Sequence, residues 1–164
     1  MDDNFYLHPS PIRRVFSVAM MVGLGALLIY IAMKTGEMSA GWKVFMLVVG
    51  AGALAVSARS WTATQAHLVL TQQGLELNTG EVLCRIDEVQ KVERGAFAFK
   101  PSNGFVVVLK SGAGAGSKAR AWAPGLYWRL GRRIGIGGVT PAGEGKAMAD
   151  ILASRVANPS SPIA

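Results

Sequence analysis

VFSVAMMVGLGALLIYIAM, residues 15–33, is an apolar run without a charged side chain, and WKVFMLVVGAGALAVSA comes after it at residues 42–58. The first run has 19 residues, so as a helix it would extend about 28 Å, close to the thickness of the hydrocarbon core of a bilayer. The second run is less obvious, because its uncharged part, residues 44–58, is short for a span by itself, but Trp42 and Trp61 bracket it as aromatic residues do at the two interfaces. Together the two runs predict a hairpin of two transmembrane helices over residues 13–61.

Residues suited to the membrane–water interface border both runs. Tryptophan is enriched at this level, and lysine and arginine reach it with long side chains whose stems lie along lipid. The predicted interface residues are Arg13, Arg14, Trp42, Lys43, Arg59 and Trp61. Three arginines flank the outer ends of the hairpin, against two lysines in its turn, so the positive-inside rule favours both termini in the cytoplasm. The expected location is the bacterial inner (cytoplasmic) membrane, as a multi-pass protein.

Two alternatives to the transmembrane hairpin remain open. The first run comes after Arg13 and Arg14 as the apolar part of a signal peptide would, although such parts are about 7–15 residues long. The second alternative is that the hairpin is buried inside a soluble protein. Neither run has a polar face, however, and a helix that is apolar all round needs a large core around it.

Small residues recur four apart within both runs, at Ala19 and Gly23 and at Ala51 and Ala55. In a membrane, small residues let helix backbones approach closely. We expect these four residues to pack the two helices on each other. The alternative is that they pack against a larger membrane complex.

The length and charge of the chain limit the kind of domain that can come after the hairpin. The chain has 164 residues and a net charge of +7, and the roughly 100 residues after the hairpin suffice for one small domain. A basic chain at a membrane is expected to meet anionic phospholipid headgroups, whereas glutamates between the basic residues disfavour nucleic acid. The single cysteine, Cys84, excludes an internal disulfide. His8 and His67 lie on opposite sides of the hairpin in sequence, and we expect no metal site and no cofactor.

After the hairpin the pattern changes to short strands. Leu75 and Leu77 alternate with polar residues, which is typical of a strand with one buried face. Residues 105–109, FVVVL, predict a central strand that is buried on both faces. A final helix is predicted from Thr140 as N-cap, with an apolar face at Met148, Ile151, Leu152 and Val156. The predicted divisions are an N-terminal tail at 1–12 that is flexible or lies at the interface, the hairpin at 13–61, the domain at 62–158 and a flexible tail at 159–164.

The stretches LVLTQQGLELN at 68–78, IDEVQKV at 86–92 and GEGKAMADIL at 143–152 resemble bacterial pleckstrin-homology-like (PH-like) membrane proteins. The resemblance implies an α+β membrane protein in which the transmembrane hairpin precedes a small antiparallel sheet or barrel closed by a C-terminal helix. It implies a fold and a location, and no catalytic residue. Residues 126–138, rich in arginine and glycine, depart from this pattern and have no evident place in the sheet.

That same segment holds the candidate binding site: Trp128, Arg129, Arg132, Arg133, Gly137 and Gly138. Arginine presents planar donors to phosphate, and tryptophan suits the headgroup level. Glycines expose backbone N–H groups that can surround an anion. We therefore predict a lipid or anion site here, with a solvated basic strand as the alternative. The glycine-rich segments do not have the spacing of nucleotide-binding loops.

No arrangement of side chains in the sequence indicates catalysis. We expect a non-enzymatic, membrane-anchored PH-like module that binds an anionic lipid headgroup or a membrane protein partner. The alternative is an accessory subunit or assembly factor of an inner-membrane complex, which would bind through its transmembrane hairpin.

Overall fold

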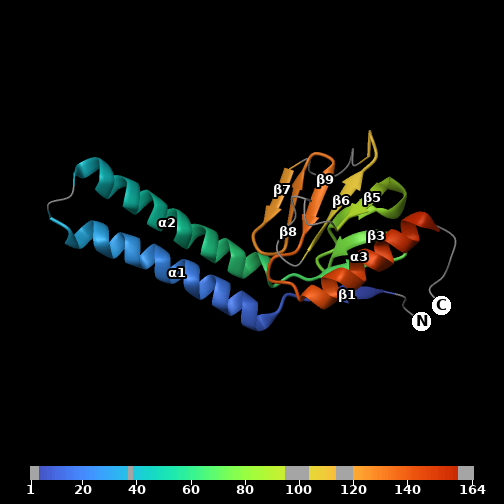
Figure 1. Ribbon diagram of the computed structural model, residues 1–164, viewed down its shortest axis with the longest axis horizontal. Coiled ribbons are helices and arrows are strands. Elements are labelled where there is room, and N and C mark those ends of the chain that lie inside the picture. Colours follow the sequence, from blue (N-terminus) through green and yellow to red (C-terminus); the bar gives the residue numbers. More distant parts are fainter. Residues whose placement is uncertain (1–3, 37–38, 95–103, 114–119, 159–164) are drawn as a thin grey trace.

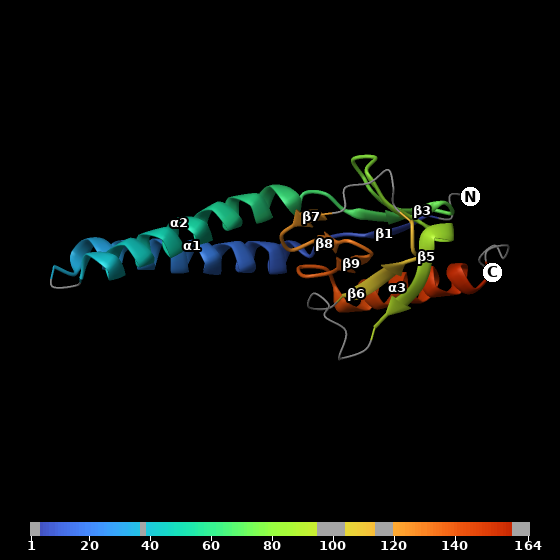
Figure 2. The ribbon, with the colours of Figure 1, turned by 90° about the horizontal axis from the view of Figure 1, so that it is seen from above.

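A computed structural model describes residues 4–36, 39–94, 104–113 and 120–158 of the chain (Figure 1). Two long helices, α1 (Pro11–Lys34) and α2 (Ala40–Ala63), lie side by side and extend away from a compact module (Figures 1 and 2). Each has 24 residues, which is about 36 Å of helix. Both are long and apolar enough to cross a membrane, and large side chains such as Phe16 and Val48 are exposed along them.

Both helices are longer than the apolar runs. Pro11 occupies the first turn of α1, where its missing N–H costs no hydrogen bond. The helix therefore starts ahead of Arg13, and α2 continues past Trp61 to Ala63. As a result, three of the predicted interface arginines, Arg13, Arg14 and Arg59, lie in helix rather than beside it.

The two helices approach each other closely at Gly25 and Gly50. A Cβ atom built on Gly25 would lie 2.9 Å from the carbonyl oxygen of Gly50, too close for any larger residue without a shift. Ser57 also donates to the carbonyl of Val18, at 3.4 Å. The structure corrects the predicted packing residues here. Ala19, Gly23, Ala51 and Ala55 are all exposed, on the outside of the helix pair.

The first sheet of the module is antiparallel, with strand order β1-β2-β3-β4. Its strands are β1 (Phe5–Leu7), β2 (Leu68–Leu70), β3 (Gly74–Leu77) and β4 (Val82–Arg85). The prediction of a flexible tail at residues 1–12 is wrong for β1. Leu7 pairs with Leu68 across the sheet and is fully buried, so the segment before the hairpin belongs to the core of the module that comes after it.

The second sheet is also antiparallel, with order β5-β6-β9-β8-β7. Its strands are β5 (Val89–Glu93), β6 (Phe105–Leu109), β7 (Arg120–Ala123), β8 (Tyr127–Leu130) and β9 (Arg133–Ile136), and the 3-10 helix η1 (Ile86–Glu88) leads into it. All five residues of β6 are buried, as predicted. The segment that had no evident place in the sheet forms the β8–β9 hairpin, with Gly131 at φ +58° in its turn.

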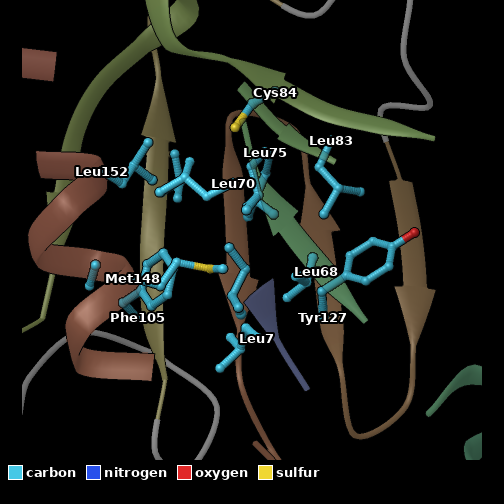
Figure 3. Packing of buried hydrophobic residues seen from close by; sticks show 14 of the residues in the cluster. Leu7, Leu68, Leu70, Leu75, Leu83, Cys84, Phe105, Tyr127, Met148 and Leu152 are labelled. Atoms are coloured by element: carbon cyan, nitrogen blue, oxygen red, sulfur yellow. The ribbon is translucent and has the colours of Figure 1, made fainter. Parts of the chain in front are cut away.

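The core lies between the two sheets and the C-terminal helix α3 (Ala142–Ala157) (Figure 3). Met148 and Leu152 of α3 are fully buried against strand residues such as Leu70 and Phe105. The apolar face predicted for the last helix is confirmed, although Pro141 rather than Thr140 is its N-cap. The fold is α+β, but the described strands do not close into a barrel. The predicted tail at 159–164 lies outside the described residues.

Candidate functional site

The outer ends of the two helices are joined to the module by side chains and backbone. The Ser10 N–H donates to the Val139 carbonyl at 2.9 Å, and Arg13 donates to the Thr140 carbonyl at 3.3 Å. On the other helix, the Ser60 hydroxyl donates to the Pro124 carbonyl at 3.2 Å. The β7–β8 turn and the loop before α3 are therefore held against the end of the hairpin.

Two arginine–tryptophan pairs lie at this junction. The Arg14 guanidinium is 4.0 Å from the centre of the Trp61 ring and donates to the Trp61 carbonyl at 2.9 Å. The Arg59 guanidinium is 5.7 Å from the Trp122 ring and donates to the Trp122 carbonyl at 3.3 Å. Such contacts combine cation–π attraction with a charge-assisted hydrogen bond. They place cationic and aromatic groups together where the helices meet the module.

The other two predicted interface residues, Trp42 and Lys43, lie at the opposite end of the hairpin, beside its turn. Trp42 stacks on Phe45 with ring centres 5.1 Å apart, and the Lys43 ammonium donates to the Gly36 carbonyl at 3.2 Å. The six predicted interface residues therefore form two groups, one at each end of the helix pair.

A pocket of about 580 Å³ opens beside Arg59 and Trp122, along the edge strand β7 and its neighbour β8. Its wall combines exposed apolar groups with charged ones, and Trp122 and Leu130 are 51% and 60% exposed. The lining residues are Arg59, Glu81, Ala121, Trp122, Tyr127, Trp128, Arg129 and Leu130.

The charges around this pocket are unevenly distributed. Arg129 is buried, and it donates to the carbonyls of Leu83 at 3.1 Å and Gly131 at 3.4 Å, which links β8 to the first sheet. Burial, and next the carboxylate of Glu81, raise the pKa of the Tyr127 phenol. The exposed guanidinium of Arg59 lies on the helix side of the pocket. The carboxylate of Glu81 and the neutral phenol of Tyr127 lie on the part of the wall that the module forms.

The predicted arginine cluster is not a single exposed surface. Arg129 points inward, which corrects the expectation that it is open to a ligand. Arg132 is exposed but donates to the Leu109 carbonyl at 2.9 Å and to the Gln90 side chain at 3.0 Å. Arg133 lies 3.9 Å from a carboxylate oxygen of Glu93. Arg132 and Arg133 follow the Gly131 turn between β8 and β9, and neither of them lines the pocket.

Trp128 and the two predicted glycines have structural contacts that the sequence did not reveal. Trp128 covers Gly135, where a Cβ atom would lie 2.2 Å from the indole ring. The Gly137 N–H donates to the Leu126 carbonyl at 2.9 Å, so it is not available to an anion. Gly138, at φ +121°, packs on the backbone of Gly125. The predicted anion nest at Gly137 and Gly138 is therefore replaced by close backbone packing.

Cys84 lies on β4 and is buried. Desolvation raises the pKa of its thiol to about 12, so the thiolate that reacts with electrophiles or binds metals is scarce at neutral pH. This residue belongs to the core (Figure 3).

Comparisons with protein-family models, with curated proteins and with solved structures find no match to this chain. The resemblance to PH-like membrane proteins is thus compatible with the order of elements, two apolar helices, antiparallel sheets and a C-terminal helix, and extends no further. The pocket residues that the sequence did not single out are Glu81, Ala121, Trp122, Tyr127 and Leu130. Trp122 had one signal, a large aromatic residue between two alanines just before a Pro-Gly turn, but its pairing with Arg59 requires the tertiary fold.

Proposed function

We propose that this chain is a non-enzymatic, membrane-anchored module of the PH-like kind that binds an anionic lipid headgroup. The helix pair anchors the module in the bacterial inner membrane, with both ends of the chain on the cytoplasmic side. The observation that carries the proposal is the position of the pocket. It opens beside Arg59 and Trp122, at the end of the hairpin where the two apolar helices leave the module.

The chemistry of this wall suits a phospholipid. The guanidinium of Arg59 presents parallel donors that match two phosphate oxygens. Trp122 supplies an aromatic surface at the level where headgroup and acyl chain meet. Since Arg59 already donates to the Trp122 carbonyl, its side chain is held in place before a ligand arrives, which reduces the entropy lost on binding.

The test uses the full chain in lipid nanodiscs of phosphatidylcholine with or without phosphatidylglycerol. Trp42 and Trp61 are replaced by Phe in every variant, so that quenching of Trp122 and Trp128 by brominated phosphatidylglycerol reports occupancy of the pocket that these two residues line. We expect Arg59→Gln to weaken the preference for the anionic lipid about tenfold, which corresponds to about 1.4 kcal/mol. The matched control is Arg133→Gln, which removes an exposed arginine that does not line the pocket. Equal quenching in the wild type and Arg59→Gln would reject the pocket, and an equal loss in both variants would indicate unspecific charge attraction.

A second function, accessory subunit or assembly factor of an inner-membrane complex, is favoured by one observation. Ala19, Gly23, Ala51 and Ala55 face outward from the helix pair, where small residues would admit another transmembrane helix. In this role the chain should co-purify from native membranes with a stoichiometric partner. We expect Gly23→Leu to lose this partner and the outward-facing control Val48→Leu to keep it. Loss in neither variant would reject this surface.

A further inference from the structure

The chain contains two histidines, and the fold places them next to each other. His8 directly follows β1, and His67 directly precedes β2. The register of these antiparallel strands pairs Leu7 with Leu68, so His8 and His67 are the next opposite pair. The centres of their imidazole rings are 4.5 Å apart, with 24° between the ring planes. In sequence, both helices of the hairpin separate them.

The two rings lie on the outer face of the first sheet. Leu7 and Leu68, the adjacent residues, point into the core and are fully buried, and successive side chains on a strand point to opposite faces. Tyr6, on the same outer face, has its ring centre 6.2 Å from that of His8 and 6.1 Å from that of His67. The rings are accessible from solvent, since His8 is exposed and His67 is partly exposed.

Neighbouring polar groups of the sheet are engaged elsewhere. On β3's side, the Asn78 side chain accepts from the backbone N–H of His67 at 3.1 Å, and Glu76 accepts from the Thr71 hydroxyl at 3.3 Å. In the described part of the chain, neither imidazole ring has a hydrogen bond to another residue. The ring nitrogens of the pair are therefore left to solvent or to a ligand.

Two adjacent imidazoles are a recurrent ligand pair for divalent transition metals. Such ions lie about 2.0–2.1 Å from the ligating nitrogen, so two rings on one ion have their centres about 4.5–5 Å apart. The observed separation of 4.5 Å lies in this range. Because the two rings are stacked, they must turn about their side-chain torsions for one nitrogen of each to point at the ion, which needs no change in strand pairing. We propose that His8 and His67 form an open, two-imidazole site for a divalent transition-metal ion of the Cu²⁺, Ni²⁺ or Zn²⁺ class.

The described residues contain no group of three or more His, Cys, Asp or Glu side chains that could hold a metal, so water completes the coordination. The site is thus of the exchangeable kind, and affinity should follow the order in which Cu²⁺ exceeds Ni²⁺ and Zn²⁺.

Metal at this site has a mechanical consequence. Because one ligand comes after β1 and the other precedes β2, the ion would connect the segment before the hairpin to the segment after it. A ligand that binds the folded state raises its stability in proportion to the logarithm of its concentration above Kd. The melting temperature should therefore rise with added metal and return to its starting value with a chelator.

The test uses the full chain in detergent micelles, purified with a tag that contains no histidine and fused ahead of Met1, so that the α-amine is not a competing ligand. One equivalent of Cu²⁺ should give an electron paramagnetic resonance spectrum with hyperfine coupling to two imidazole nitrogens. His8→Gln and His67→Gln should each weaken Cu²⁺ binding at least tenfold and show one nitrogen, and the double variant should show none. Tyr6→Phe, which removes the phenol beside the pair, is the matched control and should bind as the wild type does.

The fold of each variant is checked without metal, where the melting temperatures should agree because both side chains lie on the outer face of the sheet. A two-nitrogen spectrum that survives in the double variant would overturn the proposal, since the ligands would then lie elsewhere. Absence of binding by the wild type at submillimolar Cu²⁺, Ni²⁺ and Zn²⁺ would overturn it as well.

Discussion

Arg129 shows that the role of an arginine in this chain depends on which face of its strand it occupies. It lies on β8 with Trp128 and Leu130 on either side, and both of these are more exposed than the arginine. The usual pattern of apolar inside and charged outside is thus reversed over three residues. The reversal is stable because the guanidinium is hydrogen-bonded to backbone carbonyls, which satisfies a buried charge in part.

Removal of this arginine should destabilise the module, unlike removal of its exposed neighbours. Arg129→Gln is expected to lower the free energy of unfolding by about 1.5–3 kcal/mol, the range for hydrogen bonds to charged groups. This corresponds to several degrees in Tm, measured in detergent by tryptophan fluorescence. Arg133→Gln should change stability by less than about 0.5 kcal/mol, as exposed substitutions do. Similar losses in both variants would contradict the inward role of Arg129.

At the scale of elements, the packing of the two helices includes a close contact between two glycines. Gly25 and Gly50 bring the two backbones together, while Gly23, on the outer face of the same turn of α1, has open space around it. This contrast provides a matched test within a single helix turn.

We expect Gly25→Val to separate the helices and to cost about 1–3 kcal/mol, the range for overpacking of a close contact. Gly23→Val adds the same side chain to the outer face and should leave the stability of the hairpin nearly unchanged. Thermal melts of both variants in the same detergent measure the difference. A larger loss of stability for Gly23→Val than for Gly25→Val would contradict a helix contact at Gly25.

The strand β1 has three residues, but we expect it to contribute strongly to the stability of the module. Leu7 is fully buried, whereas its neighbour Tyr6 is 47% exposed. Leu7→Ala should therefore lower the free energy of unfolding by about 2–5 kcal/mol, and Tyr6→Ala by less than about 1 kcal/mol. A chain that starts at Thr62 should fail to fold until residues 4–8 are supplied again, for example through a flexible linker ahead of Ala66. Independent folding of the shorter chain would show that β1 is dispensable.

The sequence was informative where structure is local. The apolar spacing of Met148 and Leu152, the run at 105–109 and the alternation at Leu75 and Leu77 each depend on neighbours along the chain, and each prediction is confirmed. The failures involve partners that are distant in sequence. β1 is three residues long, too short for a periodic pattern, and its partner lies beyond both helices. His8 and His67 are likewise far apart in sequence, and so are Arg59 and Trp122, which 63 positions separate.

For the whole molecule, the pairing of β1 with β2 constrains topology. The segment before α1 and the segment after α2 share one sheet, so both must lie on the same side of any membrane that the helices cross. The turn near Gly36 must then lie on the other side. Arg13, Arg14 and Arg59 are at the module end and Lys34 and Lys43 at the turn end, which favours a cytoplasmic module.

Reporter fusions test this arrangement. Alkaline phosphatase should be inactive and a fluorescent protein fluorescent when either is fused at residue 164 or ahead of residue 1. Phosphatase inserted after Gly36 should be active. If reporters ahead of residue 1 and at residue 164 gave opposite results, the two ends would lie on different sides of the membrane, which would contradict the shared sheet. If all three sites gave the opposite of the expected results, the shared sheet would stand and the orientation in the membrane would be reversed.

The shared sheet also has a consequence for biosynthesis. The ribosome completes Phe5–Leu7 long before it completes Leu68–Leu70, and both long helices are made in between. During that interval the first strand has no partner, and its apolar side chain at Leu7 has no core to enter. It must therefore stay where translation will later deliver its partner, so that a segment made before both helices reaches its final place only after them.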